Sequence, residues 1–314
     1  MNKSLLVSAI ILPLVMTLAL SAKVQAQDES ATVLDDIVVV ARRSGAPVWL
    51  VQNGEATVIL VGSLAGVPAD TPWRPEALEA AVARADSVIL SQSATMTLGD
   101  YFRLRRARAH LPEGKTTADY LTPEWQARLA DRERAHRRDY ETRGLTWIAD
   151  DLLDAQLRYR PGTGRSASDV VRDAARRFRK PVDEVGNMNG RHIDEAVAVP
   201  DEGQVACLTA AIMANESGVE GVRARGLAWT RQDVPAVLAN PREWAADRCQ
   251  WFADETLIAQ GRTQWSEAVG RALAGAGTTM VVAPISVVAE PGGLLDQAEG
   301  RGLDVVGPEW RPVP

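Results

Sequence analysis

Residues Ala56–Pro68 read ATVILVGSLAGVP, an apolar run that ends at Gly62 in a short turn. The four consecutive apolar side chains at positions 58–61 predict a strand that is buried on both faces of a sheet. Ligands of open α/β sheets bind at the carboxyl ends of such strands. A second apolar run, TTMVVAP at Thr278–Pro284, also ends in a loop that leads into a helix. We therefore expect the two strands to lie side by side, so that the loops after them face one crevice.

The segments around the first strand predict an α/β fold with a mixed, largely parallel sheet. Pro47–Gln52 precedes the turn residues Asn53 and Gly54, and this arrangement predicts a hairpin. A helix at Trp73–Ala85 and a strand at Asp86–Leu90 follow, and this order favours a right-handed crossover between parallel strands. The sheet is thus expected to combine segments from the N- and C-terminal parts of the chain.

The middle of the chain predicts a helical region within one domain, which we expect to cover residues 47–314. Ser166 is placed to cap a helix that runs to Arg179. The other expected helices are Thr122–Arg138, Leu145–Leu157, Gln204–Asn215, Pro241–Ala259, Arg262–Ala274 and Gly293–Glu299, and further short strands are expected at Lys180–Gly186 and Leu303–Val306. Trp265, Val269 and Leu273 recur every four residues, which predicts one buried helix face.

The composition places the chain among ordinary globular proteins. Its 314 residues are 46% hydrophobic and 24% charged, enough to build a full core. The formal net charge of −6 argues against a nucleic-acid-binding protein with a basic surface. Arg103–Arg108 (RLRRAR) is strongly basic, but the acidic residues around it favour a solvated helix face over a site for an acidic partner.

The N-terminus predicts export. Lys3 is followed by an apolar run at Leu5–Leu20 and by a small-residue cleavage sequence that ends at Ala26, so residues 1–26 have the pattern of a secretory signal peptide. Cleavage would remove two of the 35 basic residues and leave 33 against 41 acidic ones, a formal charge of about −8. We therefore expect a periplasmic protein without a membrane span after cleavage. The alternative is an uncleaved anchor.

Residues 27–46 are expected to form an N-terminal tether. Within them, Ile37–Ala41 is apolar and predicts a short strand or a docked extended segment. The sequence LDDIVVVARRS at Leu34–Ser44 is similar to the TonB box of TonB-dependent outer-membrane receptors, although the rest of the chain does not follow the pattern of those receptors. This similarity makes an envelope protein that docks on Leu34–Ser44 a candidate partner.

Cys207 and Cys249 are the only cysteines. In an exported protein, an even pair most simply forms one disulfide, and the alternative is two buried thiols. The bridge would join residues 42 positions apart, for which the chain-entropy relation gives a stabilisation on the order of 4 kcal/mol. A catalytic thiol is disfavoured because no histidine lies in an evident partner motif.

The sequence carries none of the familiar catalytic motifs. It has no Gly-x-Ser-x-Gly elbow, no His-Glu-x-x-His motif and no paired Cys-x-x-Cys. His110, His136 and His192 lie in polar or basic segments, which favours solvated surface positions. The sequence GTGRS at positions 162–166 departs from a P-loop, because Arg165 stands where the lysine belongs. We expect neither a metal ion nor another cofactor.

The order of the elements resembles that of the TraB/GumN family, which is related to the Tiki proteins. The resemblance runs from about Pro47 to Pro308 and rests on LVGSLAGVP, EALEAAVARAD, the strand VIL, and then RTQW, VVAP and GGLLDQAEGRGLDVV. It implies an α/β fold, and active members of the family resemble metal-dependent peptidases.

The resemblance also marks three positions where active members hold the metal. A Gly-x-x-His motif ends the second strand, a glutamate ends the next, and a second Gly-x-x-His ends a late strand. Such side chains suit a divalent metal that keeps one open position for water. Here the three positions fall at Ala65, Ser91 and Ser286. A methyl group and two hydroxyls are poor ligands, so the resemblance implies a degenerate member without metal chemistry.

The leading hypothesis is therefore an exported, non-catalytic protein that binds a small molecule, a peptide or an envelope partner at the strand ends. The candidate contacts are Ser63, Ser91, Arg262 and Ser286. One alternative is a hydrolase or peptidase that uses other residues, such as Asp70, Glu290 or His192. A second alternative is an accessory of a TonB-dependent system.

Overall fold

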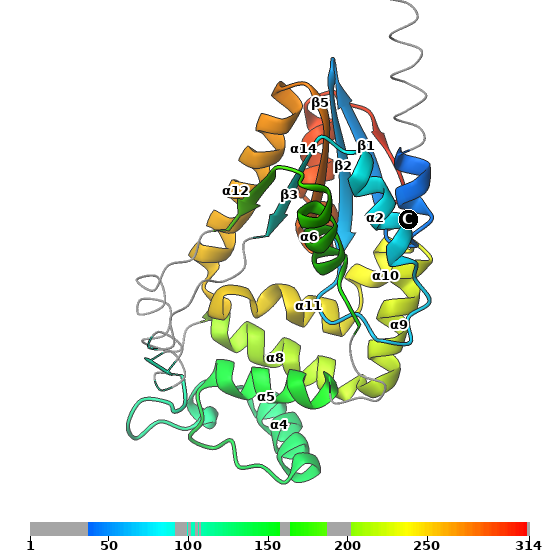
Figure 1. Cartoon of the computed structure of the whole chain (residues 1–314). Coiled ribbons are helices and arrows are strands. Elements are labelled where there is room, and N and C mark those ends of the chain that lie inside the picture. Colours follow the sequence, from blue (N-terminus) through cyan, green and yellow to red (C-terminus); the bar gives the residue numbers. More distant parts are fainter. Residues whose placement is uncertain are drawn as a thin grey trace, which may run out of the picture.

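The computed structural model describes residues 37–91, 99, 102–103, 106, 108–157, 164–186 and 202–312. The fold is α/β, and a mixed sheet of six strands has the order β4-β3-β5-β2-β1-β6 (Figure 1). Parallel pairing joins β2 to β5, β5 to β3 and β3 to β4, whereas β1 is antiparallel to both β2 and β6. The predicted fold class is thus confirmed.

The central strand β2 (Ala56–Ser63) is the stretch that decides the fold. All eight of its residues are buried, so helices must cover both faces of the sheet at this point. On one side β2 forms the predicted hairpin with β1 (Val48–Asn53), and on the other it pairs with β5 (Gly277–Pro284). The expectation that strands from the two ends of the chain lie side by side is therefore confirmed.

The remaining strands complete the sheet on its two edges. β3 (Ser87–Ser91) pairs with β5, so β5 separates β3 from β2 even though only α2 (Pro75–Arg84) lies between them in the sequence. β4 (Val182–Val185) forms one edge beyond β3, and β6 (Val305–Val306) forms the other beyond β1.

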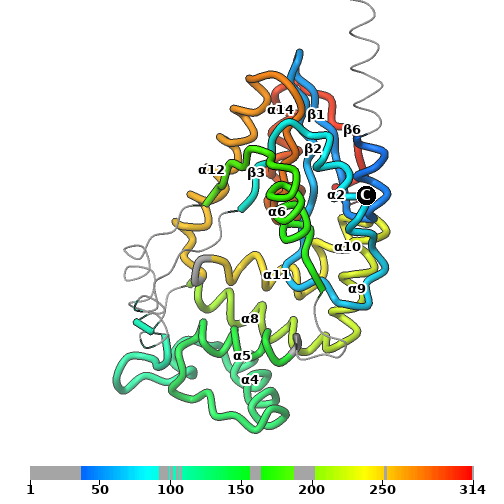
Figure 2. The backbone as a smooth tube through the Cα atoms, viewed as in Figure 1, coloured from blue at the N-terminus to red at the C-terminus, as the bar shows by residue number. Residues whose placement is uncertain are grey.

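The helices form two groups, as Figures 1 and 2 show. One group covers the sheet: α6 packs on α2 and contacts β2, β3 and β5. The later helices α12 and α13 also contact β2. The other group, α4, α5, α8 and α11, lies beyond the end of the sheet at which β2 stops. The bounds are α4 Pro123–His136, α5 Leu145–Leu157, α6 Ala167–Phe178, α8 Glu202–Glu216, α9 Gly218–Thr230, α10 Val234–Leu238, α11 Pro241–Arg248, α12 Glu255–Ala274, α13 Ile285–Ala289 and α14 Leu294–Gly300, with 3-10 turns at Thr117–Asp119 and Gln250–Ala253.

Two hydrophobic clusters correspond to these groups. The sheet cluster gathers the strands with side chains of α2, α6, α9 and α12, including the predicted face Trp265, Val269 and Leu273. The helical cluster gathers side chains of α4, α5, α8 and α11. Burial of apolar residues explains why α6 of the middle region packs on the sheet, and why α4, α5, α8 and α11 pack on one another beyond its end.

The structure corrects two expectations. Residues 37–42 are helical rather than extended, because Ile37, Val38 and Ala41 share one helix face and are buried in the sheet cluster, and this packing outweighs the β preference of the apolar run. The helix expected at Pro241–Ala259 ends instead at Arg248, and a new helix begins where the Asp254 carboxylate accepts a hydrogen bond from the Leu257 amide.

The signal segment 1–26 and the start of the Leu34–Ser44 segment lie outside the described residues. Among the residues that the structure does describe, no helix combines the length and the apolar character needed to cross a membrane.

Candidate functional site

A cavity of about 460 Å³ lies at the carboxyl ends of β2, β3 and β5. The strand register explains its position, because Ser63 at the end of β2 pairs with Pro284 at the end of β5. Ser91 ends β3, and Ser286 lies in the first turn of α13 directly after β5. All four residues line the cavity. Parallel strands therefore bring three of the predicted contact residues, Ser63, Ser91 and Ser286, to one site.

The cavity wall is rich in hydroxyl groups. Ser166 and Ser168, at the start of α6, add two more serines to the three at the strand ends. Ser168 Oγ donates a hydrogen bond to Ser63 Oγ over 3.2 Å, which ties α6 to the end of β2. Arg172 of the same helix donates from Nη2 to the Ser91 carbonyl over 2.6 Å, which fixes the end of β3. The serines are thus held by a framework that does not depend on a ligand.

The first turn of α6 forms one end of the wall. Ser166 caps the helix as predicted, because its Oγ accepts a hydrogen bond from the Asp169 amide at 3.1 Å. The Asp169 Oδ2 atom in turn accepts hydrogen bonds from the Ser166 amide and hydroxyl at 3.0 and 2.7 Å. This part of the GTGRS stretch is therefore a helix cap that faces the cavity, while positions 162 and 163 lie outside the described residues.

A buried ion pair contributes one more lining residue, Glu243. Arg225 of α9 is fully buried and donates from Nη1 to Glu243 Oε2 of α11 over 3.0 Å. The other end of its guanidinium, Nη2, donates to the carbonyls of Ala65 and Gly66, the latter over 3.2 Å. Trp229 Nε1 donates to the Gly62 carbonyl over 2.7 Å. Arg225 thus fixes the loop that follows β2, Trp229 fixes the end of β2 itself, and Glu243 lines the cavity.

Charges near Glu243 act on it in opposite directions. Burial raises the pKa of the Glu243 carboxyl, the Arg225 guanidinium lowers it, and the neighbouring carboxylates of Asp247 and Glu290 raise it further. Burial in turn lowers the pKa of Arg225, and Glu243 opposes that shift. Removing either partner would leave the other charge uncompensated in the protein interior.

Arg262, the fourth predicted contact, lines a smaller adjoining cavity of about 50 Å³ rather than the larger one. Its Nη2 atom donates to Glu290 Oε2 over 2.8 Å and to both carboxylate oxygens of Asp247 over 3.1 Å. Ser91, Gln250 and Pro284 line both cavities, so the two spaces are neighbours. Arg262 is therefore adjacent to the serine-lined cavity, and its guanidinium is engaged by two acidic residues.

The other residues considered for chemistry lie elsewhere. Asp70 Oδ2 is 3.6 Å from Arg223 Nε on the surface, and His136 Nε2 contacts Asn215 Oδ1 at 3.1 Å. His110 forms an isolated antiparallel β-bridge with Arg143 through the backbone. His192, the remaining histidine, lies outside the described residues.

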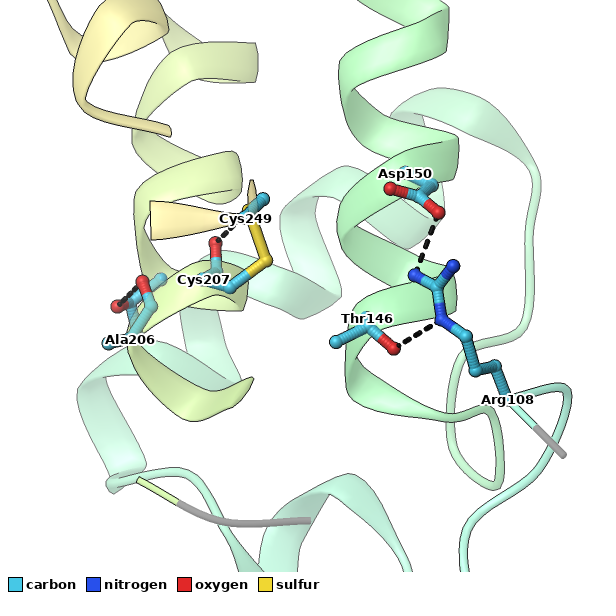
Figure 3. The surroundings of a disulfide bond; sticks show 7 residues. Arg108, Thr146, Asp150, Ala206, Cys207 and Cys249 are labelled. Atoms are coloured by element: carbon cyan, nitrogen blue, oxygen red, sulfur yellow. Dashed lines mark hydrogen bonds and ion pairs between the residues drawn. A yellow bond between two sulfur atoms is a disulfide. The ribbon is translucent and has the colours of Figure 1, made fainter. Parts of the chain in front are cut away.

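Cys207 and Cys249 lie at disulfide distance, with sulfur atoms 2.14 Å apart, and the bridge ties α8 to the residue that ends α11 (Figure 3). Figure 3 also shows Arg108 reaching α5, where its guanidinium donates to Thr146 Oγ1 and Asp150 Oδ2 over 2.9 and 2.8 Å. The acidic face of α5 is thus paired with arginine at this point.

A sequence profile of the TraB/PrgY/gumN family matches residues 47–306, which is most of the chain. The chain belongs to this family. No curated protein and no solved structure matches it. The family match covers every strand of the sheet and all but the end of the segment over which the resemblance runs.

Family membership raises the question of whether the cavity suits a catalytic metal. Ala65, Ser91 and Ser286, the three positions that the resemblance assigns to metal ligands, do line one cavity. Their side chains offer a methyl group and two hydroxyls, and a catalytic divalent ion prefers imidazole and carboxylate. Within the described ranges, no group of three or more His, Cys, Asp or Glu side chains is arranged to hold a metal ion. The donor set of these positions does not fit such an ion.

Sequence reasoning missed Arg225 and Glu243. Arginine and glutamate on helices are usually solvated, and nothing in their local sequence distinguishes this pair from the surface charges around it. The two are 18 residues apart, and Arg225 contacts a loop 160 residues away in the sequence. The tertiary structure is needed to bring them together.

Proposed function

We propose that this member of the family is an exported binding protein, which holds a small molecule or a peptide in the serine-lined cavity and acts without the metal chemistry of active members. The observation that carries the proposal is that Ala65, Ser91 and Ser286 line one cavity while supplying no nitrogen or carboxylate ligand. In this proposal the site stays at the strand ends, and its side chains bind a ligand without a metal ion.

The shape of the site supports binding. A volume of about 460 Å³ falls within the range of small-molecule pockets, roughly 300–1,000 Å³. Arg225 fixes the loop after β2, Trp229 fixes the end of β2, and Arg172 fixes the end of β3. A largely preformed wall lowers the ordering cost of binding.

A rebuilt metal site would test the loss of metal chemistry. The triple variant Ala65→His/Ser91→Glu/Ser286→His supplies the ligand types of active members, and Ala65→Gln/Ser91→Gln/Ser286→Gln is its control. Calorimetry with Zn²⁺, Mn²⁺ and Co²⁺ should detect binding to the rebuilt protein and none to the native chain or the control. Stoichiometric binding to the native chain, or chelator-sensitive peptidase activity in it, would overturn the proposal.

A cavity-filling variant would test binding itself. Ala65 is an exposed residue that lines the cavity, so Ala65→Trp should fill part of the space without disturbing the core. Val219 on α9 is 42% exposed and does not line the cavity, so Val219→Trp is the matched control. Native mass spectrometry of protein purified from the periplasm should show a bound small molecule or peptide that Ala65→Trp loses and Val219→Trp keeps.

Export is part of the proposal and rests on the signal pattern of residues 1–26. The measurement is the intact mass of the protein from the periplasmic fraction, which should correspond to a chain that starts at Gln27. A mass that includes residues 1–26 would favour the uncleaved anchor.

A role beside a TonB-dependent system is the second candidate, because Leu34–Ser44 is similar to a TonB box. Ile37, Val38 and Ala41 of this segment are buried in the sheet cluster, so docking through them would require the segment to leave the core. Partner recovery that is unchanged when Leu34–Ser44 is deleted would remove this candidate.

A further inference from the structure

The side chains that line the serine-lined cavity carry acidic charge. Asp169 and Glu243 both line it, and among the described residues lining the cavity there is no lysine, arginine or histidine. The remaining polar groups are five serine hydroxyls and Gln250, which accept hydrogen bonds as well as donate them. A ligand that brings N–H donors and positive charge would therefore meet complementary groups.

Of these groups, Glu243 is expected to interact most strongly with a cation. Its side chain is only 5% exposed, and Arg225 occupies Oε2. The other oxygen, Oε1, accepts no hydrogen bond from any residue that the structure describes. A carboxylate oxygen held this far from bulk water interacts strongly with a cation, because the surrounding dielectric is low.

The arginines near Glu243 do not occupy the position in the cavity that a cationic ligand would take. Arg225 lies behind the wall, where its guanidinium bonds the loop carbonyls, and Arg242 donates to the Leu153 carbonyl over 3.1 Å. Arg262 is engaged by Asp247 and Glu290 beside the smaller cavity. The arginines thus moderate the acidic field, and the carboxylates remain the charged groups that line the cavity.

Asp169 is the second acidic residue that lines the cavity. It offsets the positive end of the α6 dipole, which would otherwise favour an anion at this position. Its Oδ2 atom serves the helix cap, and Oδ1 accepts no hydrogen bond within the described part of the chain. An anionic ligand would meet this carboxylate and Glu243 without a lining cation to balance them.

We infer that the cavity recognises a small organic cation, a molecule or peptide end that carries a primary ammonium or guanidinium group, through Glu243 and the serine hydroxyls. An ammonium group needs several hydrogen-bond acceptors rather than the imidazole and carboxylate set of a catalytic metal, so hydroxyls serve it well. The inference rests on the proposed binding function and narrows it to one ligand chemistry.

The test uses two matched sets of probes with the intact mature protein. One set is 1,4-diaminobutane, 1,4-butanediol and succinate, and the other is glucosamine, glucose and glucuronate. Within each set the size is similar and the charge changes from positive to neutral to negative. Ligand-observed NMR titrations should give Kd values for the amines at least tenfold lower than those for their neutral and anionic matches.

Variants assign the binding to the cavity. Glu243→Gln should raise the amine Kd at least fivefold, whereas Glu220→Gln, which changes an 82% exposed side chain on α9, should not. Because Glu243→Gln also removes the partner of Arg225, Ala65→Lys provides a second test that leaves the ion pair intact. Its ammonium group should block the amines more strongly than the uncharged Ala65→Met does.

The possible outcomes distinguish failure of the cation inference from failure of the proposed binding function. If neutral or anionic probes bind as tightly as amines and Ala65→Met weakens them, the cavity binds ligands and the inference of a cation is wrong. Equal effects of Ala65→Lys and Ala65→Met on amine binding would also overturn it. If no probe of any charge binds, both the inference and the binding function fail.

Discussion

The sheet layer, which is the strands with α2, α6, α12 and α13, and the helical layer, which is α4, α5, α8 and α11, are held together in different ways. In the sheet layer, β2 is buried along its whole length, and backbone pairing with β1 and β5 fixes the position of every residue. The helical layer has no such ladder. Its apolar cluster is joined to the rest by side-chain contacts, among them the buried ion pair of Arg225 with Glu243 and the bonds from Arg262 to Asp247, and is tied internally by the Cys207–Cys249 link.

The difference shows how the cavity between the layers is built. The strand ends provide Ser63, Ser91 and Ser286 at positions set by the register, and the helical side provides Glu243, whose carboxylate is held by Arg225. A wall that depends on strand register changes little with any one side chain. A wall that depends on one charged pair is sensitive to either member.

The largest expected effect comes from breaking the ion pair. Arg225→Gln or Glu243→Gln alone should lower the free energy of unfolding by about 3–5 kcal/mol. Glu243→Gln leaves the buried Arg225 charge without its partner, and Arg225→Gln leaves both the Glu243 charge and the loop carbonyls without theirs. The double variant should lose less than the sum of the two single losses. Urea denaturation measures all three, and additive losses would show that the pair does not couple the layers.

The disulfide should have the next largest effect, and it should be local. Cys207→Ser/Cys249→Ser is expected to lower stability by roughly 2–4 kcal/mol. Hydrogen exchange should locate the loss in α8 and α11, with β2 and β5 still protected. Equal loss of protection in the sheet would contradict the separation of the two layers.

A pH-dependent contribution is expected in the helical layer. Tyr140 is buried and its hydroxyl donates to Asp151 Oδ2 over 2.7 Å, and burial, followed by this hydrogen bond, raises the pKa of Tyr140 above its usual value. A raised pKa contributes stability that is complete below about pH 10 and is lost as the pH rises toward the folded-state pKa. Tyr140→Phe should cost about 1.5–3 kcal/mol at pH 7.

The measurement for Tyr140 is chemical denaturation of both proteins from pH 8 to pH 11. The gap between the native chain and Tyr140→Phe should narrow above about pH 10, because only the native chain must release a phenol proton on unfolding. A constant gap across this range would rule out the hydrogen bond to Asp151 as its origin.

The smallest expected effect lies at the helix cap beside the cavity. Ser166→Ala should cost about 1 kcal/mol, because it removes the bond to the Asp169 amide. Thr122 precedes α4 in the same way but its side chain makes no cap hydrogen bond, so Thr122→Ala should change stability by less than about 0.5 kcal/mol. Equal losses would show that the observed cap geometry does not decide the energetics.

Local patterns predicted most of the elements. Asn53 and Gly54 marked the hairpin, Ser166 marked the start of α6, and the apolar runs marked β2 and β5. The errors fell where packing outweighs local preference, as at residues 37–42, or where a cap interrupts a helical pattern, as at Asp254. Neither outcome can be read from periodicity alone.

By itself, the sequence determined the strands, their burial and the serines at their carboxyl ends, because these follow from runs of apolar residues and from turn residues within a few positions of one another. Only the tertiary structure decided that β5 lies between β2 and β3, that Arg262 lies beside the serine-lined cavity rather than within it, and that Arg225 and Glu243 meet behind the loop after β2. Such contacts join positions far apart in the chain, and the free energy that selects them comes from burying the whole surface at once rather than from any local pattern.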